Sequence, residues 1–448
     1  MSRRHLPINL LKEFLFKENF ALHRQLVVFL LLTFGLLTGF FWINRSKFQP
    51  TSKIHDDCVT PNQQALKNNK NPQPQSVKKF QVAEVIVESG ATRNAPSEES
   101  IRLTPLPKGT RAIITETKED WLRLDYGVWI NKEDTQVLST TVIPRSFVCD
   151  TLFREKPGKT EVVFPLQAPV PVTIQQGEGW FGLTLHNSTL RQEIKPPEND
   201  RVISRMSLQQ PAPGQVRYGF NFKSPQQWGY NLRYEKNNLI LSFRQSPFTQ
   251  QEGFLKSVQG MGMPLSGMTI VIDPGHGGLD SGAVSPNGYK EKELAFTISQ
   301  LLRQQLELRG ATVYFTREDD IDVSLAERMA IINRLEPTLA LSIHYNHVPN
   351  NVDGASIKGI ATYWYHPQST GLAKYLNSYI VKQLSRADNG VKWKNLALAR
   401  PTIAPSVLLE LGFMSNSQEL SWIINPGEQS RLAQTIADGV AAWFESVK

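Results

Sequence analysis

Apolar residues recur at every second position along much of the first half of the chain. In a first stretch, 81–138, alternating runs such as VAEVIVES, TRAIITE and DWLRLDY are separated by turn residues, which is typical of β-strands. A second stretch, 139–260, alternates most clearly in VRYGFNF at 216–222, which fits a half-buried strand. Here WGYNLRYE and LILSFR flank turn residues at 236–238, which predicts a hairpin. We therefore expect two consecutive all-β regions.

From Met268 the pattern changes, and strand-like and helix-like segments alternate to the C-terminus. MTIVID, ATVYFTR, LALSIHYN and PSVLLELGF are expected to be strands. A helix is expected over 291–309, and Ser324 with Glu327 forms a capping box that opens the next one. Two further helices are expected in GLAKYLNSYIVKQLSRA and RLAQTIADGVAAWFESV. This alternation predicts an α/β domain with a largely parallel sheet at 261–448.

The N-terminal region contains an uncharged apolar run, LVVFLLLTFGLLTGFFWI at 26–43, which is long enough for a membrane-spanning helix. A cleaved signal peptide would be shorter and would end in small residues, whereas this run ends in aromatic residues. Five basic residues lie in 1–24, so the positive-inside rule predicts a cytoplasmic N-terminus. We expect an uncleaved single-pass anchor at 25–44, with everything after it on the outer side of the inner membrane, in the periplasm or outside the cell.

The composition and net charge of the chain indicate less about its fold and function than the hydrophobic pattern does. Residues 45–80 are rich in Asn, Gln, Pro, Ser and Lys, and we expect a disordered linker there. The net charge of +8 suits an anionic setting, but Lys and Arg form no dense tract and nucleic acid is not an expected partner. Two cysteines, Cys58 and Cys149, exclude a disulfide framework, and whether they pair is open.

Candidate chemistry gathers where the predicted strands of the α/β domain end. His276 follows MTIVID, His344 ends LALSIH, Glu410 ends PSVLLE, and Glu291 begins a helix. Ligands of open α/β sheets gather at the carboxyl ends of strands. Two imidazoles, a carboxylate and an open position match the donor set of a catalytic zinc site. We therefore expect these residues to share one site.

Each of these residues also has a simpler interpretation. His276 could be a hydrogen-bonding turn residue, Glu291 could favour the helix dipole, and His344 could be a core histidine. Glu410 is harder to explain in this way, because an unpaired carboxylate in VLLELGF is costly to bury. His347 is left out of the expected ligand set, because a spacing of three on a strand puts it on the opposite face from His344.

Four motifs in this region, VIDPGHGGLDSGA, GYKEKEL, SIHYNH and APSVLLELGFMSN, occur in the order found in one family. They resemble the zinc-dependent N-acetylmuramoyl-L-alanine amidases of the peptidoglycan amidase 3 type. The resemblance implies that His276, Glu291 and His344 hold zinc and that Glu410 is the catalytic acid and base. Asp273 and Asp280 either orient the imidazoles or stabilise the turn.

The implied activity is hydrolysis of the amide between N-acetylmuramic acid and the L-alanine of the stem peptide, with peptidoglycan as substrate. Alternatives are a zinc peptidase acting on the stem peptide and a non-catalytic wall-binding protein. Residues 81–138 resemble bacterial SH3-like barrels in their LPKGT turn and their Trp-x-x-Leu and Gly-x-Trp-Ile strands. Residues 139–260 are faintly similar to β-sandwich targeting modules of wall amidases, and a spacer is the alternative. Protein partners, including an activator, stay open.

Overall fold

The structure is a computed structural model that describes residues 79–148, 151–191, 200–249, 263–348 and 356–448. All of these belong to the second of two compact units of the chain, Gln63–Lys448. Within these ranges no helix is both long and apolar enough to cross a bilayer. The predicted anchor at 25–44, Cys58 and Cys149 lie outside the described residues.

The first described region is a small antiparallel β-structure. Its main sheet has the order β3-β7-β6-β5-β1-β8, and β2 pairs with β4. The strands are β1 (Phe80–Val85), β2 (Ser89–Gly90), β3 (Thr92–Arg93), β4 (Leu106–Pro107), β5 (Arg111–Lys118), β6 (Trp121–Leu124), β7 (Trp129–Asn131) and β8 (Thr135–Thr140). Leu122 and Leu124 of β6 and Ile130 of β7 are buried in its core. The region is all-β as predicted, and its likeness to SH3 domains stays a prediction.

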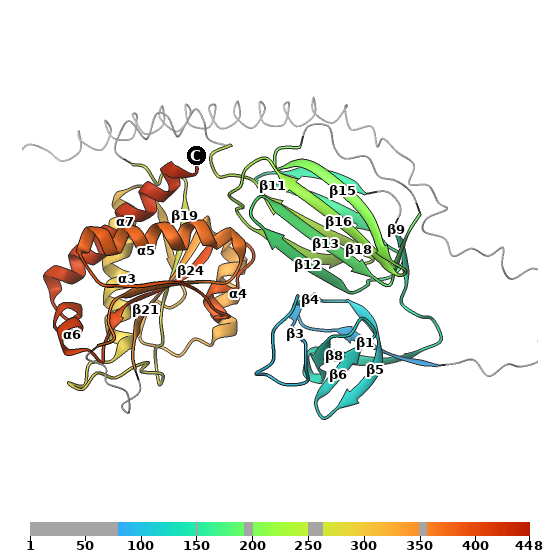
Figure 1. Cartoon of the computed structure of the whole chain (residues 1–448), viewed down its shortest axis with the longest axis horizontal. Helices are drawn as coiled ribbons and strands as arrows, with labels where there is room; N and C mark the ends of the chain where they lie inside the picture. Colours follow the sequence, from blue (N-terminus) through green and yellow to red (C-terminus); the bar gives the residue numbers. More distant parts are fainter. Residues whose placement is uncertain (1–78, 149–150, 192–199, 250–262, 349–355) are drawn as a thin grey trace, which may run out of the picture. The chain divides into compact units, whose positions relative to one another are not determined.

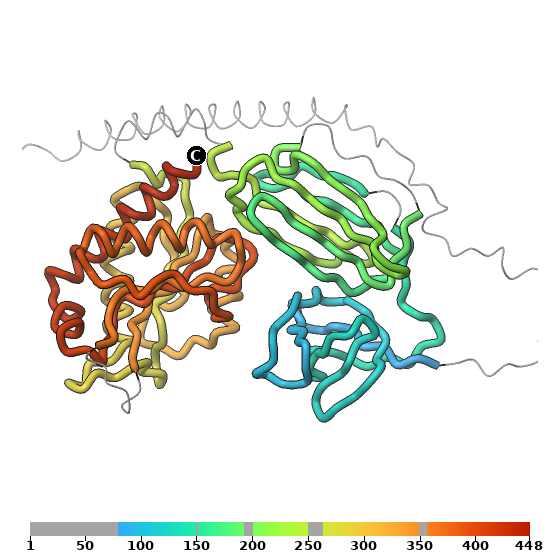
Figure 2. Tube along the Cα trace, in the orientation of Figure 1, coloured from blue at the N-terminus to red at the C-terminus, as the bar shows by residue number. Residues whose placement is uncertain are grey.

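The second region contains two four-stranded antiparallel sheets, β10-β11-β18-β17 and β12-β13-β16-β15, and a two-stranded parallel sheet of β9 and β14 (Figure 1). The strands are β9 (Ser146–Val148), β10 (Leu152–Lys156), β11 (Lys159–Pro165), β12 (Val172–Gly177), β13 (Trp180–His186), β14 (Ser188–Leu190), β15 (Ile203–Ala212), β16 (Gln215–Phe222), β17 (Tyr230–Glu235) and β18 (Asn238–Arg244). Phe181 of one sheet meets Phe243 of the other at a ring distance of 5.0 Å. The predicted hairpin forms between β17 and β18. In Figure 2 the colour along the chain changes from blue in the first region to green in the second.

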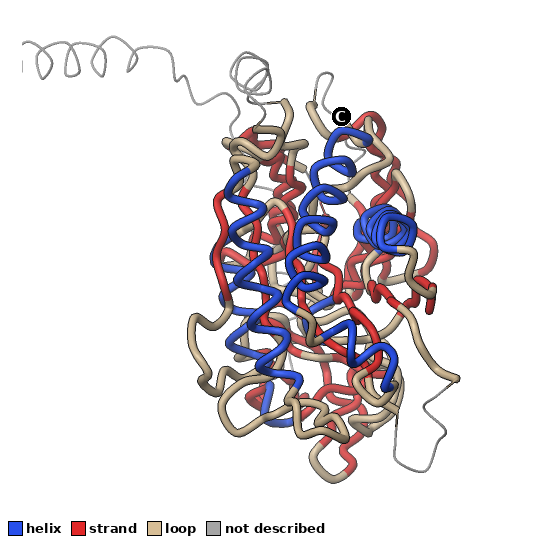
Figure 3. Tube along the Cα trace, turned by 90° about the vertical axis from the view of Figure 1, so that its left-hand side faces the viewer, coloured by secondary structure: helices blue, strands red, loops and turns tan. Residues whose placement is uncertain are grey.

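The third region is the predicted α/β structure, with a sheet of order β20-β19-β21-β24-β22-β23. Every ladder is parallel except the one between β22 and β24. The strands are β19 (Thr269–Pro274), β20 (Thr312–Phe315), β21 (Leu339–Asn346), β22 (Ile360–Trp364), β23 (Asp388–Trp393) and β24 (Ser406–Phe413). The helices, blue in Figure 3, are α3 (Glu291–Leu308), α4 (Leu325–Leu335), α5 (Thr370–Leu384), α6 (Ser417–Ile423) and α7 (Pro426–Ser446). The capping box of Ser324 and Glu327 opens α4 as predicted.

The two faces of this sheet carry different residues. On one face, Ile343 of β21 and Leu409 of β24 join the apolar core formed with α3, α5 and α7. On the other face, α4 and the short helix η6 (Ala397–Ala399) pack over Val271 and Ala340. Because side chains alternate along a strand, His344 and Glu410 belong to this second face, and their strands place them side by side in register. The fold therefore brings two of the predicted site residues together.

Candidate active site

The glycine-rich loop after β19 has a backbone that few residues tolerate. His276 has a φ of 56°, in the left-handed region that is sparsely populated by residues other than glycine. A Cβ atom on Gly275 would lie 2.4 Å from the His344 ring. One on Gly282 would lie 2.6 Å from Oε2 of Glu291. The glycines therefore provide the space in which His276 can face Glu291 and His344.

Two buried arginines donate hydrogen bonds to the backbone carbonyl groups of this loop. Arg328, 4% exposed, donates from Nη1 to the carbonyl oxygen of Pro274 at 2.7 Å and from Nη2 to that of His276 at 2.6 Å. Arg317, 2% exposed, donates to the carbonyl oxygens of Pro274 at 3.1 Å and Gly275 at 3.0 Å. Since the loop carbonyls point into the protein, these donors satisfy groups that would otherwise be buried without partners. We call Arg317 and Arg328 the arginine cradle.

Asp273 anchors the cradle. Its Oδ1 accepts hydrogen bonds from Thr316 at 2.5 Å and Arg328 at 3.0 Å, and its Oδ2 accepts one from Ser342 at 2.6 Å. Of the two aspartates expected near the imidazoles, Asp280 is the one whose carboxylate meets a histidine, at 2.7 Å from Nδ1 of His276. Asp280 therefore orients an imidazole, whereas Asp273 orients a guanidinium group.

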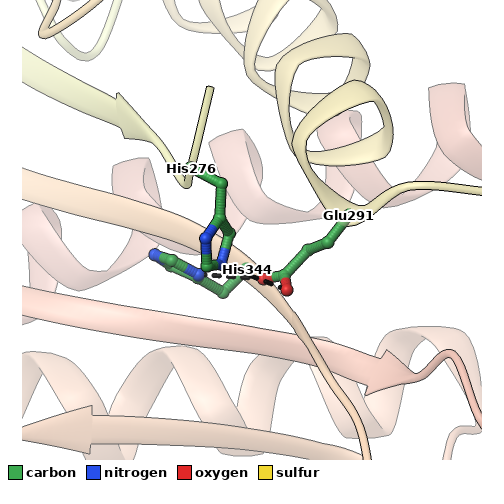
Figure 4. A group of neighbouring side chains, drawn as sticks. All are labelled: His276, Glu291 and His344. Atoms are coloured by element: carbon green, nitrogen blue, oxygen red, sulfur yellow. Dashed lines mark hydrogen bonds and ion pairs between the residues drawn. The ribbon is translucent and has the colours of Figure 1, made fainter. Parts of the chain in front are cut away.

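His276, Glu291 and His344 converge on one point from the loop, the start of α3 and the end of β21 (Figure 4). Nε2 of His276 lies 3.1 Å from Oε2 of Glu291, and Nδ1 of His344 lies 2.9 Å from Oε1. One ligand atom from each residue lies within 4.8 Å of the other two. Ligands of a tetrahedral zinc ion are roughly 3.3 Å apart, given bonds of about 2.0–2.1 Å. The donor types and their spacing therefore fit such an ion.

Backbone groups fix the carboxylate of this cluster. The N–H groups of Ala283 and Tyr345 donate to Glu291 at 2.9 and 3.1 Å. Burial alone would raise the pKa of Glu291, but hydrogen bonds from His276 and His344 outweigh it and hold that pKa well below its usual range. Burial alone would lower the pKa of His276, yet the Glu291 and Asp280 carboxylates raise it to about 9. Without metal, the cluster is therefore a network of ion pairs.

Glu410 stands beside this cluster and is not part of it. It pairs in register with His344, so both side chains lie on the same face of the sheet. Among the described residues, no group donates a hydrogen bond to its buried Oε2 atom. Burial raises the pKa of Glu410 to about 7, with the Glu291 charge adding to the effect and His344 opposing it. A half-buried carboxyl with one buried, unbonded oxygen and a pKa near neutrality is suited to proton transfer.

Known proteins resemble the region that carries this site. Residues 270–442 match the protein family described as N-acetylmuramoyl-L-alanine amidase, Amidase_3. The catalytic domain of CwlV, an N-acetylmuramoyl-L-alanine amidase from Bacillus (Paenibacillus) polymyxa var. colistinus, is 31% identical, and the match covers 40% of this chain and 99% of that one, with a TM-score of 0.38. This region belongs to the N-acetylmuramoyl-L-alanine amidase family. The resemblance of the four motifs to this family is thereby confirmed.

Two further comparisons describe the extent of the likeness. An N-acetylmuramoyl-L-alanine amidase of Clostridium difficile 630 is 32% identical, with 40% of this chain and 98% of that one covered and a TM-score of 0.39. The probable cell wall amidase LytH of Staphylococcus aureus is 37% identical over 185 residues, which are 41% of this chain and 60% of LytH. The chain thus spans about 60% of the length of the curated relatives that it matches. The two β-rich regions lie outside the family match.

The amidase region also contains functional residues that sequence reasoning missed. Arg317 and Arg328 stand in ATVYFTR and in α4, where an arginine is usually taken as a solvated charge. The sequence could indicate their role only indirectly, because a loop whose carbonyl groups turn inward requires buried hydrogen-bond donors. In the described part of the chain, His347 is not in the group of His276, Glu291 and His344 that could share a metal ion.

The raised pKa of Glu410 predicts how the stability of the metal-free amidase depends on pH. The pKa rises from 4.5 to about 7 on folding, so the folded protein binds more protons between these values. The contribution of Glu410 to the free energy of unfolding therefore falls as pH rises from about 5 to above 7, by about 3 kcal/mol. The substitution Glu410→Gln should remove this fall. Chemical denaturation at pH 5 and pH 8 in the presence of a chelator measures the free energy of unfolding of the wild type and the variant. If this free energy changes equally with pH in both proteins, the prediction is wrong.

Proposed function

We propose that this protein is a peptidoglycan hydrolase that cleaves the amide between N-acetylmuramic acid and the L-alanine of the stem peptide. The observation that carries the proposal is Glu410, whose free carboxylate oxygen is buried beside a group of two imidazoles and a carboxylate able to hold a metal ion. The family match supports amide hydrolysis in the cell wall. In this proposal His276, Glu291 and His344 hold zinc.

Zinc, when bound, supplies a Lewis acid that polarises the amide carbonyl and lowers the pKa of a water molecule. The protein contributes the proton transfers. The free oxygen of Glu410 accepts a proton from the attacking water and delivers it to the leaving nitrogen of L-alanine. The C–N bond breaks, and the products are a lactyl carboxylate and a free amine. Asp280 keeps the Nε2 atom of His276 turned toward Glu291 by meeting its other ring nitrogen.

The same site could serve a zinc peptidase acting within the stem peptide, and a protein without activity could still bind wall material. Digestion of purified peptidoglycan, followed by mass spectrometry of the products, separates these functions. An amidase releases intact stem peptides from the glycan, whereas a peptidase leaves shortened stems on the sugar. Unchanged material would indicate a binding protein and would refute the proposal.

Zinc binding itself is tested by removing a ligand. In the variant His276→Ala, we expect zinc affinity to fall by more than the roughly 10–100-fold that loss of an outer partner causes. The variant Glu293→Gln is a matched control, because Glu293 lies two positions from Glu291 on α3 with its side chain 59% exposed. Metal analysis after dialysis against zinc measures both variants. Equal zinc content in the two would overturn the assignment of His276.

We further propose that residues 25–44 anchor the protein in the cytoplasmic membrane, with the amidase region on the outer side where peptidoglycan lies. The apolar run and the basic residues before it support this orientation. In this arrangement 81–138 is an SH3-like domain, and 139–260 serves in targeting or spacing. Protease treatment of intact spheroplasts tests the orientation, because only an outward-facing amidase region would be digested.

A further inference from the structure

The face of the sheet that carries Glu410 continues across the next two strands. In the register of β22 with β24, Ala361 pairs with Glu410 and Tyr363 with Leu408. In the register of β23 with β22, Lys392 pairs with Tyr363. Because paired residues point to the same face, Glu410, Tyr363 and Lys392 share one surface, and Lys394 follows two positions after Lys392. We call Tyr363, Lys392 and Lys394 the lysine patch.

The lysine patch lies close to the catalytic groups. The Tyr363 hydroxyl hydrogen-bonds the side chain of Asn346, which ends the strand carrying His344. The Tyr363 side chain therefore reaches across β24 toward β21. Lys394 is one of the charges that act on the Glu410 carboxyl, where it opposes the rise in pKa caused by burial. A substrate whose amide lies at Glu410 must therefore pass near these side chains.

The charges of the lysine patch are poorly balanced. The Nζ atoms of Lys392 and Lys394 lie 5.9 and 5.7 Å from the centre of the Tyr363 ring, and both side chains are exposed. Neither lysine forms an ion pair with a carboxylate in the described part of the chain. One aromatic ring attracts a cation only weakly at an exposed site, and two cations on the same ring repel each other. An anion placed between them would relieve this repulsion.

We propose that the lysine patch binds a carboxylate of the stem peptide, next to the amide that Glu410 helps to cleave. This inference rests on the proposed function and adds a substrate preference to it. The ligand is an acidic peptide attached through L-alanine to the muramyl group, with a free carboxylate on a residue that follows the alanine. On β22 and β23 the side chains of this face are half-buried at Tyr363 and exposed at Lys392, whereas α4 and η6 pack over Val271 of β19 and Ala340 of β21. The peptide therefore extends from the metal cluster toward β23, while the sugar lies on the other side of the scissile bond.

The test uses the full chain and two soluble substrates. Both are N-acetylmuramyl-L-alanyl peptides of the same length; in one the residue after alanine keeps its free carboxylate, and in the other this carboxylate is amidated. We expect kcat/KM to be about 3- to 10-fold higher for the acidic substrate, the effect of one or two exposed ion pairs. The difference should lie in KM, since the lysines bind substrate and take no part in proton transfer. The preference for the acidic substrate should decrease as salt is added, because salt screens the ion pairs.

The variants Lys394→Met and Lys392→Met/Lys394→Met should lose this preference, so that the ratio of kcat/KM for the acidic substrate to kcat/KM for the amidated substrate falls toward one. Lys374→Met is the control, because Lys374 is an exposed lysine of α5, which covers the opposite face of the sheet. If the wild type cleaves both substrates equally, or if Lys374→Met loses the preference to the same extent, the lysine patch does not bind the carboxylate. If the wild type cleaves neither substrate, the proposed function fails, and the two failures are thus distinguishable.

Discussion

The substitution Glu410→Gln is expected to lower kcat for release of the stem peptide by about 10²- to 10⁴-fold. Glutamine keeps the shape of the side chain but cannot accept a proton at its amide oxygen in the relevant pH range. The cluster of His276, Glu291 and His344 does not include Glu410, so the variant should bind zinc as the wild type does. Single-turnover assays on a muropeptide, together with metal analysis, measure both quantities.

A matched variant separates this effect from a general loss of charge. Glu318→Gln removes a carboxylate that is 62% exposed and pairs with Arg303 away from the cluster. Its activity should stay within a factor of about two of the wild type, because exposed ion pairs contribute little. Full hydrolysis by Glu410→Gln would show that another group moves the proton. Loss of zinc from the same variant would show that Glu410 belongs to the metal site.

The burial of Glu410 links its proposed role to the stability of the fold. A carboxylate with a free oxygen among apolar residues destabilises the folded protein at neutral pH, whereas the same burial gives it a pKa suited to accepting and returning a proton. Glu410→Gln should therefore make the metal-free protein more stable at pH 8 while it lowers kcat. Such opposite effects from one substitution are expected of a catalytic group and not of a structural one.

The sequence predicted those parts of the amidase region that rest on local pattern. The strands around MTIVID, LALSIHYN and PSVLLELGF are continuous apolar runs, because strands at the centre of a parallel sheet are buried on both faces. β23 was missed because it is an edge strand with exposed lysines and carries no such run. The antiparallel direction of β22 was also missed, because it depends on contacts with β24, more than forty positions away in the chain. Tyr363 and Lys392 of the lysine patch lie on these two strands, and Lys394 directly follows β23.

The candidate site was predictable to the same degree. His276, His344 and Glu410 could be found because each lies late in an apolar strand or just after one, where a polar residue is conspicuous. The arginines that fix the backbone of His276 could not be predicted from the pattern of apolar and polar residues. The left-handed backbone at His276 and the direction of the loop carbonyls are features of three-dimensional structure, and the arginines that satisfy them come from segments more than forty residues away.

Removing one arginine of the cradle is expected to have the largest effect on the fold. In Arg328→Met, the buried carboxylate of Asp273 loses its cationic partner, since the side chains are only 4% and 3% exposed. Breaking such a pair typically destabilises a protein by about 3–5 kcal/mol. The carbonyl of His276 also loses its donor, so the left-handed conformation is no longer held and zinc affinity should fall by roughly 10–100-fold. Arg334→Met, at an exposed position of the same helix, should change neither quantity by more than about 0.5 kcal/mol.

The double variant Asp273→Asn/Arg328→Met decides between a role in stability and a role in positioning. The amide oxygen of asparagine can accept a hydrogen bond from one of the Thr316 and Ser342 hydroxyls, and its amide nitrogen can donate to the other. No buried charge remains unpaired, so much of the lost stability should return. Zinc affinity should stay low, because the donor to the His276 carbonyl is still missing. Chemical denaturation measures the first quantity, and competition with a chromophoric chelator measures the second. If zinc affinity recovers together with stability, the cradle only stabilises the fold; if it stays low while stability recovers, Arg328 positions His276 for metal binding.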